Sequence, residues 1–548
     1  MGEAGSAPGV TLPRTIAALV ERRLAGLDST SLAVLFAGAV LGRQFDVELL
    51  ADTAHVDATS VLDAYRVLRE GQIWEEGPGG SMRFVHEYLR ETAYTRIAGS
   101  ERTALHRRAA AAVERRYPGG DRESHFAALG HHHAEAGDAQ PAAQYFEQAG
   151  DHARASYANQ DALRLYRLAL VQLGSGEEGA DATCRLEEAI GDVLLIQGDA
   201  GGAREAFGRS LDRGTGLSRV SRARRRRKLA RTWERDHRHA DALSSYVLAE
   251  AELGAPPPDG EAGTAWWREL VEIRVEKAWD LYFLNEVEQL TQLVDQVRPI
   301  VERYSGTGQR GRFFLAAAHA EIRRRRYRVG EDSLQYTRGL LAAAHASGEL
   351  QLLAVAQFSH AFLLLMGGDE AAAEPLFVEA LQGAERLGDH GLQARFLSYH
   401  ALLHRRLGRL DRARATAERA VFHASSARML DYLGMAEATF AWVALREGRG
   451  SDVEGHAARA LSAWNELRAT YVFPFEWLAR MPLAARSLEL GARGAAVEQW
   501  RLLLDERQQQ LPDALERTIR SALEAADKMS FQERAREVVA LATALKFL

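Results

Sequence analysis

An all-α fold, with one small β-hairpin near the N-terminus and an α-solenoid after it, is the class that the sequence predicts. Three observations lead there. Apolar residues have helical spacing along most of the chain, two short apolar runs flank a glycine-rich turn, and packing residues recur at a fixed interval. The 548 residues, 47% of them hydrophobic and 26% charged, can bury a large core or several smaller ones.

The segment that ends near residue 118 is expected to hold short helices followed by a hairpin, after a flexible tail over 1–11. A helix in "TIAALVERRLAGL" precedes "STSLAVLFAGAVLG", which begins with Ser29 or Thr30 as the N-cap and closes on Gly42. "FDVELLADTA" and "DATSVLDAYRVLREGQ" follow as a helix pair. "IWEE" and "MRFV" then form a hairpin across "GPGGS", whose glycines supply positive φ. This order predicts a winged-helix domain with a connecting helix over 12–118.

Winged helices often bind DNA, but the charges of the predicted recognition helix argue against it here. "DATSVLDAYRVLREG" carries Asp57, Asp63 and Glu70 against Arg66 and Arg69. A nearly neutral surface is unsuited to neutralising phosphates, so DNA is not an expected partner.

Beyond Glu101 the chain is helical almost without interruption, and small and aromatic residues recur in register. In "FAALGHHHAEAGDAQPAAQYFEQA", Gly130 and Ala142 let two antiparallel helices cross closely, and Phe146 fills the gap beneath them. These are the offsets of a tetratricopeptide repeat. Further copies contain Ile190, Gly191, Ala203, Phe207, Ser210, Leu229, Ala230, Ala242, Tyr246 and Ala249.

The later copies repeat every 40 residues, longer than the usual unit of about 34. Helices extended by about one turn account for the difference. Stacked helix pairs bury a continuous core and leave a concave binding surface, so 119–548 is predicted to be a tetratricopeptide-like superhelix with loops at 174–181 and 254–263. The recurring residues are Ala373, Phe377, Ala380, Ala413, Ala417, Ala420, Val453, Ala457 and Ala460.

No motif in the sequence points to catalysis. The chain has no P-loop, and the G-x-G-x-x-G matches "GSGEEG" and "GTGQRG" lie between helices without a preceding strand. H-E-x-x-H, C-x-x-C and G-x-S-x-G are absent too. The sequence therefore predicts no enzyme, no catalytic residue and no cofactor.

The run "GHHHAEAG" suggests a metal site, but its geometry is unfavourable. Consecutive helical residues point about 100° apart, so His131, His132 and His133 cannot converge on one ion. No metal is expected, and His133 is predicted to be a half-buried contact within a helix pair.

Two arginine clusters, "SRARRRRKLARTW" and "EIRRRRYRVG", are each predicted inside the first helix of a repeat. In tetratricopeptide proteins one face of that helix tends to line the groove. The resemblance therefore implies an anion-binding strip for acidic peptide, nucleotide or nucleic acid. A solvated face paired with acidic residues is the favoured alternative. The strip contains Arg224, Arg227, Arg231, Arg325, Arg326, Arg395, Arg405 and Arg406.

Three segments together resemble a known family: "TLPRTIAALVERRLAGLDSTSLAVLFAGAVLGRQFDVELLA", "RFVHEYLRETAYTRI" and "ERTALHRRAAAAVERRYP". They are similar to the winged helix and repeat entry of STAND-class signalling ATPases, the maltose-regulator-like and cyclase-associated bacterial group. In that family an ATPase module precedes the winged helix, and the repeats form a sensor that holds the switch off or receives an inducer or partner.

The resemblance also implies a role for His86, where a strand ends and a helix begins. "FVHEYLR" is similar to the Met-His-Asp motif of related nucleotide switches, with Val85 and Glu87 in the places of Met and Asp. There the histidine reaches the β-phosphate of bound ADP, and a helix N-terminus suits an anion. A helix-start residue packed against the hairpin is the alternative for His86.

The predicted function is a regulatory or sensory module that binds a protein, peptide or small effector in its groove and relays that event to a nucleotide switch. Since the chain has no P-loop, the ATPase module belongs either to a longer protein or to a separate partner. "EVVALATALKFL" carries no helix-turn-helix, which disfavours direct transcription control. A pure scaffold and a nucleotide- or RNA-binding solenoid are the alternatives.

The net charge and the single cysteine indicate the expected cellular compartment. A net charge of −6 gives no general attraction to nucleic acid or anionic membrane. Cys184, interpreted as a packed apolar residue, allows no intrachain disulfide and fits a reducing cytoplasm. Without a signal peptide or an uninterrupted apolar span, a cytoplasmic protein with no membrane contact is expected.

Overall fold

The computed structural model describes the chain in seven stretches and divides it into two compact units. Unit 1 is Met1–Gly179 and unit 2 is Ala180–Leu548. The tail predicted over 1–11, most of the helix predicted in "TIAALVERRLAGL" and parts of the two predicted interhelical loops lie outside the described residues. The described residues are 23–24, 26–174, 179–214, 216–257, 261–468, 472–525 and 527–548.

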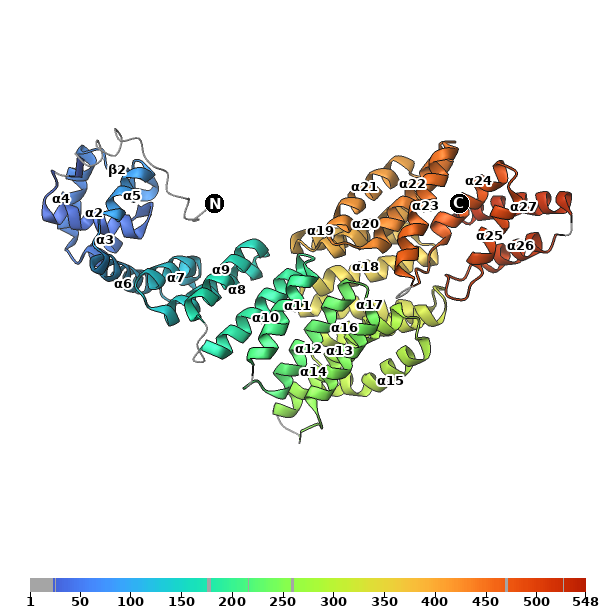
Figure 1. The fold of residues 1–548 in the computed structure, drawn as a ribbon, viewed down its shortest axis with the longest axis horizontal. Helices are drawn as coiled ribbons and strands as arrows, with labels where there is room; N and C mark the ends of the chain where they lie inside the picture. The colour runs from blue at the N-terminus through green and yellow to red at the C-terminus, as the bar shows by residue number, and fades with distance from the viewer. Residues whose placement is uncertain are drawn as a thin grey trace. The chain divides into compact units, whose positions relative to one another are not determined.

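Unit 1 contains short helices, three short strands and then longer helices (Figure 1). Its elements are α2 (Ser29–Leu41), β1 (Gln44–Phe45), α3 (Val47–Ala54), α4 (Ala58–Glu70), β2 (Trp74–Glu76), the 3₁₀ turn η1 (Pro78–Gly80), β3 (Met82–Phe84), α5 (Glu87–Thr95), α6 (Gly99–Arg116), the 3₁₀ segment η2 (Gly119–His125), α7 (Phe126–Glu135), α8 (Ala139–Ala155) and α9 (Asn159–Leu173).

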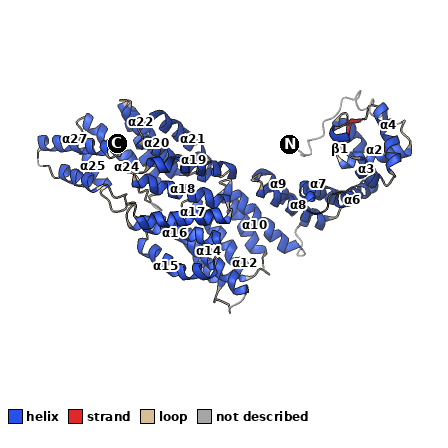
Figure 2. Cartoon of the chain, turned by 180° about the vertical axis from the view of Figure 1, so that it is seen from behind, coloured by secondary structure: helices blue, strands red, loops and turns tan. Residues whose placement is uncertain are grey.

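The predicted hairpin is confirmed, and the structure adds a third strand to it. β2 and β3 pair antiparallel with Trp74 opposite Phe84, and β1 pairs with the other edge of β3. Strands are drawn in red in Figure 2. Phe45 lies on β1 rather than in the predicted helix "FDVELLADTA", which begins at Val47. Its ring packs 4.8 Å from that of Trp74, so burial in this aromatic cluster holds Phe45 in the sheet.

Two helix starts near the sheet differ in how well the sequence predicted them. α2 begins after Asp28, whose carboxylate accepts a hydrogen bond from the Ser31 amide at 2.9 Å. The predicted N-caps, Ser29 and Thr30, are therefore wrong, because the stronger acceptor lies one residue earlier. α5 begins at Glu87 with His86 as its N-cap residue, which confirms the predicted strand-to-helix junction.

Unit 2 is a stack of helix pairs. They are α10 (Ala180–Ile196) and α11 (Ala200–Arg213), α12 (Arg219–Arg235) and α13 (His239–Leu253), α14 (Glu261–Phe283) and α15 (Val287–Tyr304), α16 (Thr307–Arg324) and α17 (Glu331–Ser347), α18 (Leu350–Gly367) and α19 (Glu370–Leu387), α20 (His390–Arg406) and α21 (Leu410–Ser426), α22 (Leu430–Arg446) and α23 (Gly450–Leu467), α24 (Trp477–Glu489) and α25 (Arg493–Leu503), and α26 (Asp513–Leu523) and α27 (Lys528–Ala544).

This arrangement is the predicted α-solenoid. The two helices of each pair contact one another, and first helices such as α12, α14, α16, α18 and α20 also contact the first helix of the next pair. The small residues predicted to recur every 40 positions are buried, with Ala373, Ala413 and Val453 each 0% exposed. The period therefore records the positions at which neighbouring helices cross.

Glycines at the crossings permit the close approach that the sequence predicted. A Cβ placed on Gly130 would lie 2.6 Å from the ring of Phe146, and one on Gly191 would lie 2.5 Å from Phe207. Any larger residue at these positions would displace the aromatic ring of the paired helix. His133 is half-buried against Tyr145 across the same pair, with its ring stacked at 5.5 Å, as predicted.

Contacts between distant repeats close the superhelix of unit 2. Arg235, at the end of α12, lies 3.4 Å from Asp389, before α20. His237 lies 3.6 Å from Asp431 on α22, and Lys546 lies 2.9 Å from Glu370 on α19. These links join repeats that are far apart in the sequence of unit 2.

One described helix, α18, is long and apolar enough to pass as a membrane span, with a mean hydropathy of 1.6 over 18 residues. Half of that window is buried inside the protein. Phe358 and Leu363 of α18 belong to the main core, where Phe358 stacks on Phe396 at 4.5 Å. α18 is therefore described as a core helix of the solenoid.

Candidate functional site

A groove of about 460 Å³ lies along the first helices of unit 2, within the range of about 300–1,000 Å³ typical of small-ligand sites. Helices α12, α14, α16, α18 and α20 supply most of its wall. The residues that line it are Arg227, Arg231, Glu234, Glu272, Val275, Glu276, Trp279, Arg312, Leu315, Ala316, His319, Glu349, Gln351, Leu352, Val355 and Arg395.

Arg227 is held by two carboxylates at one end of the groove. Its Nε donates to Glu269 Oε1 and its Nη1 to Glu276 Oε1, both at 2.6 Å. Burial alone would lower the pKa of Arg227, but the glutamates outweigh it and raise that pKa well above its usual range. Arg227 is 8% exposed, and two glutamates bind its guanidinium. It therefore stabilises the wall of the groove.

A second ion-pair group lies beside the first. Arg312 on α16 donates to Glu272 on α14 at 2.9 Å and to Glu349 at 2.9 Å. Burial would raise the pKa of Glu272, but Arg312 and Arg227 outweigh it and lower that pKa. These ion pairs give Glu272, Arg312 and Glu349 oppositely charged partners.

Arg395 differs from Arg227 and Arg312 because it forms no hydrogen bond or ion pair with any described residue. Its guanidinium carbon instead lies 4.8 Å from the ring centre of Trp279 and 4.6 Å from that of Phe358. Two aromatic faces therefore hold the guanidinium, leaving its five N–H donors to other groups.

Arg231 also forms no hydrogen bond or ion pair within the described chain. Burial would lower the pKa of Arg231, but the field of Glu276 and Glu234 raises it. Burial also raises the pKa of Glu234 well above its usual range, and Asp280 and Glu276 add to that rise.

His319 and a small inner cavity extend the site below Arg395. His319 packs 4.8 Å from Trp279, and burial followed by the charge of Arg395 lowers the pKa of its imidazole to about 3. The neutral ring can donate or accept one hydrogen bond at neutral pH. A cavity of about 30 Å³ continues beneath it, between Tyr282, Phe358 and Tyr399, with room for one water molecule.

Three members of the predicted arginine strip, Arg227, Arg231 and Arg395, therefore line one groove, and the others lie elsewhere. Arg224 points to Glu188 at 3.3 Å. Arg405 is 3% exposed and donates to the Leu478 and Phe547 carbonyls, at 2.8 and 3.0 Å. Arg406 donates to the Leu365 carbonyl at 2.6 Å, so both are occupied inside the solenoid.

The second arginine cluster does not lie wholly inside a helix, as the sequence predicted. α16 ends at Arg324, Arg325 follows as its C-cap beside Glu321 at 2.5 Å, and Arg326 has a left-handed φ of 47°. Arg326 donates to the main-chain carbonyl of Asp505 at 3.0 Å. The helix stops because the next residue, Tyr327, turns inward and is 2% exposed.

His86, the residue predicted to sense a nucleotide, is exposed at the start of α5 in unit 1. Its side chain forms no capping hydrogen bond. The packed alternative is not what the structure has, because His86 is exposed.

Unit 1 has a larger depression of about 900 Å³ between α3, α4 and α6. Its charges are already paired: Arg115 binds Asp52 at 3.0 Å, and Arg108 donates to the Thr53 carbonyl at 2.7 Å. No Phe, Tyr or Trp lines it. The smaller groove of unit 2, with its unpaired guanidinium and aromatic wall, is the stronger candidate site.

Trp279 and His319 were not predicted from the sequence, although the 40-residue period identifies their positions. Stepping back from Arg395 by the 40-residue period gives Val355, Leu315 and Val275, all of which line the groove. The same step links Trp279 to His319. The prediction of the 40-residue period used only the small packing residues, whereas groove-lining positions on the first helices recur with the same period.

Comparisons with known proteins give structural similarity alone. No family model matches the chain, and no curated protein matches it in sequence. The chain is similar to a STAND protein with a tetratricopeptide repeat sensor from Pyrococcus horikoshii, at 12% identity and a TM-score of 0.45, covering 85% of this chain and 66% of that one. It thus spans less than two thirds of that protein.

Two further solved structures are similar over most of their own length. A Rap protein complexed with Competence and Sporulation Factor has 15% identity and a TM-score of 0.48, over 67% of this chain and 97% of that one. Aspartyl phosphate phosphatase F from Bacillus subtilis has 12% identity and a TM-score of 0.32, over 72% and 98%. No functional conclusion follows from similarities at these values.

Proposed function

We propose that the chain is a regulatory or sensory binding module whose unit 2 groove takes an acidic peptide or a small anionic effector. The observation that carries the proposal is Arg395, a guanidinium held by Trp279 and Phe358 with no acid partner among the described residues. Every other charged residue of the groove except Arg231 has a partner. A carboxylate or phosphate of a ligand supplies the anionic hydrogen-bond partner that Arg395 does not have among the described residues.

The rest of the groove favours a ligand with an apolar portion next to its acidic group. Val275, Leu315, Leu352 and Val355 form an apolar strip, and its side chains come from three successive first helices. An extended peptide with an acidic residue flanked by apolar ones matches this surface. The neutral imidazole of His319 adds one hydrogen bond without adding charge.

RNA or nucleotide binding along the whole arginine strip is less well supported. Arg224 and Arg226 pair with Glu188 and Glu252, at 3.3 and 2.8 Å, and Arg405 is buried. A strip whose charges are already compensated releases few counterions from a polyanion. We therefore propose a compact anionic group as the ligand and no enzymatic activity for this chain.

Binding is expected to depend on charge. Among short peptides with Asp or Glu flanked by Leu, Val or Phe, the acidic members should bind more tightly than their Asn or Gln counterparts. Charge-assisted hydrogen bonds contribute about 1.5–3 kcal/mol, which is about 10- to 100-fold in affinity. Fluorescence anisotropy measures the pairs, at low salt and at about 0.5 M. Equal affinities for acid and amide peptides would contradict the proposal.

We further propose that unit 1 relays ligand binding to a nucleotide switch. On this proposal 12–118 is a winged helix, 119–548 is the sensor, and a STAND-type ATPase module, in cis or in trans, is the partner in the cytoplasm. The exposed position of His86 supports a contact with a nucleotide outside this chain. Affinity capture from host lysate tests the relay: a P-loop ATPase that His86→Ala fails to recover supports it, and capture that His86→Ala leaves unchanged refutes it.

A further inference from the structure

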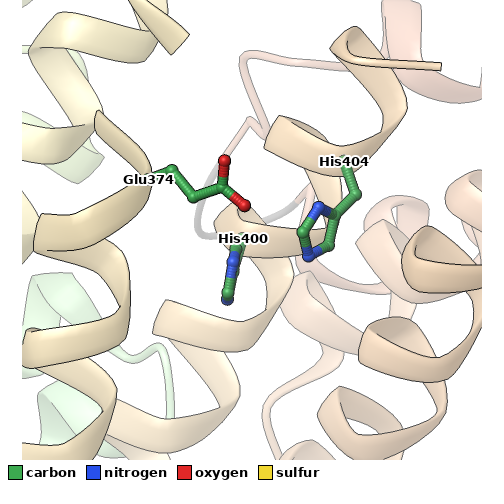
Figure 3. Close-up of side chains that lie close together, drawn as sticks. All are labelled: Glu374, His400 and His404. Carbon is green, nitrogen blue, oxygen red and sulfur yellow. The ribbon is translucent and has the colours of Figure 1, made fainter. Parts of the chain in front are cut away.

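Three potential metal ligands meet between α19 and α20, away from the groove. Glu374 reaches from α19, and His400 and His404 stand one turn apart on α20 (Figure 3). One ligand atom of each lies within 4.8 Å of the others. Histidines at i and i+4 share one helix face, a common way to place two imidazoles on one ion.

The two histidines leave buried nitrogen atoms without a partner. His400 Nε2 and His404 Nδ1 form no hydrogen bond, and His404 is 5% exposed. A buried polar atom left in this state costs about 1–3 kcal/mol. His360 occupies the equivalent position one repeat earlier, and its Nδ1 lies 2.8 Å from Thr337 Oγ1. These two nitrogen atoms on α20 therefore lack a hydrogen-bond partner, whereas His360 on α18 has one.

The three side chains supply ligand types that zinc takes in proteins. Two imidazole nitrogens come from one face of α20 and one carboxylate oxygen comes from α19.

Two arginines beside the Glu374 carboxylate partly offset its negative charge, and a phenylalanine packs against His400. Arg409 Nη1 donates to Glu374 Oε1 at 2.5 Å, and Arg412 lies 4.0 Å from the same oxygen. The ring of His400 stacks on Phe377, with centres 5.9 Å apart. Contacts of this kind orient metal ligands from behind.

We propose that Glu374, His400 and His404 bind a divalent transition-metal ion, with zinc as the best match. Two nitrogens and one oxygen are a common zinc ligand set, and three protein ligands leave a fourth position for water or another group. Ligand atoms in a tetrahedral zinc site lie about 3.4 Å apart. The three ligand atoms, which lie within 4.8 Å of one another, would have to move closer to reach that spacing. The ion would link α19 to α20.

Isothermal titration calorimetry of the chelator-treated full chain with zinc chloride tests the site. Wild type is expected to take up one zinc ion that His404→Ala and Glu374→Gln bind about 10-fold more weakly or not at all. His360→Ala is the matched control and should bind as wild type does. Cobalt, bound at the same site, should give the visible absorption of a tetrahedral complex in wild type and His360→Ala but not in His404→Ala or Glu374→Gln.

A second readout separates metal loss from misfolding. Zinc should raise the urea unfolding midpoint of wild type and His360→Ala but leave that of Glu374→Gln unchanged, while the metal-free proteins have the same circular dichroism spectrum. Absence of zinc uptake by wild type overturns the proposal. Equal zinc uptake by wild type and Glu374→Gln overturns it too, since the metal would then lie elsewhere.

Discussion

Arg395→Ala is expected to weaken binding of an acidic peptide about 10- to 100-fold while leaving its amide counterpart nearly unaffected. Like Arg231, Arg395 has neither an ion pair nor a hydrogen bond to a described residue, so its removal takes away ligand contacts and few internal ones. Its contacts with Trp279 and Phe358 are apolar and cation–π in nature. Anisotropy titrations of the two peptides against wild type and variant measure the effect.

Arg459→Ala is the matched control for Arg395→Ala. Arg459 on α23 is exposed and pairs with Glu437 on α22 at 3.0 Å, and neither residue lines the groove. Its loss should leave acidic-peptide affinity unchanged. Equal weakening in both variants would point to a general charge effect, and no weakening in Arg395→Ala would remove this residue from the site.

Arg405→Ala is expected to lower the free energy of unfolding of unit 2 by about 3–5 kcal/mol. Its two hydrogen bonds join α20 to the Leu478 carbonyl of α24 and to the Phe547 carbonyl after α27. Both carbonyls would lose a buried donor, and the space beside Trp442 and Trp477 would be left empty. Burial lowers the pKa of Arg405 to about 9, so the side chain is charged at neutral pH.

Urea unfolding followed by tryptophan fluorescence measures this loss. Arg419→Ala serves as the control, because Arg419 is exposed and pairs with Glu385 at the surface at 2.9 Å. That variant should change the free energy of unfolding by less than about 1 kcal/mol. If Arg405→Ala falls in the same range, Arg405 does not join the repeats in the way its contacts indicate.

The helices and their crossings could be predicted because local patterns determine them. Gly130 and Phe146 are fixed by the distance between two crossing helices, and only a few residue types fit there. The 40-residue recurrence of Ala373 and Ala413 has the same cause. β1 was missed because a strand of two residues, Gln44–Phe45, has no alternating pattern to detect.

The site was only partly predictable, because pairing across repeats depends on the superhelix. The sequence places Arg227 and Arg395 on first helices but does not show that Glu269 and Glu276 neutralise one while the other has no acid partner. Arg405 is buried by the C-terminal segment, 142 residues away in sequence. Such contacts arise from the curvature of the whole unit, and no local pattern records them.

Hydrogen exchange with and without the tightest acidic peptide tests the central claim, that the unit 2 groove is the ligand site, most directly. The account predicts slower exchange in the first helices that carry Trp279, His319 and Arg395, and unchanged exchange around the unit 1 depression lined by Asp52 and Arg115. Slower exchange confined to unit 1, with the groove helices unaffected, would contradict it.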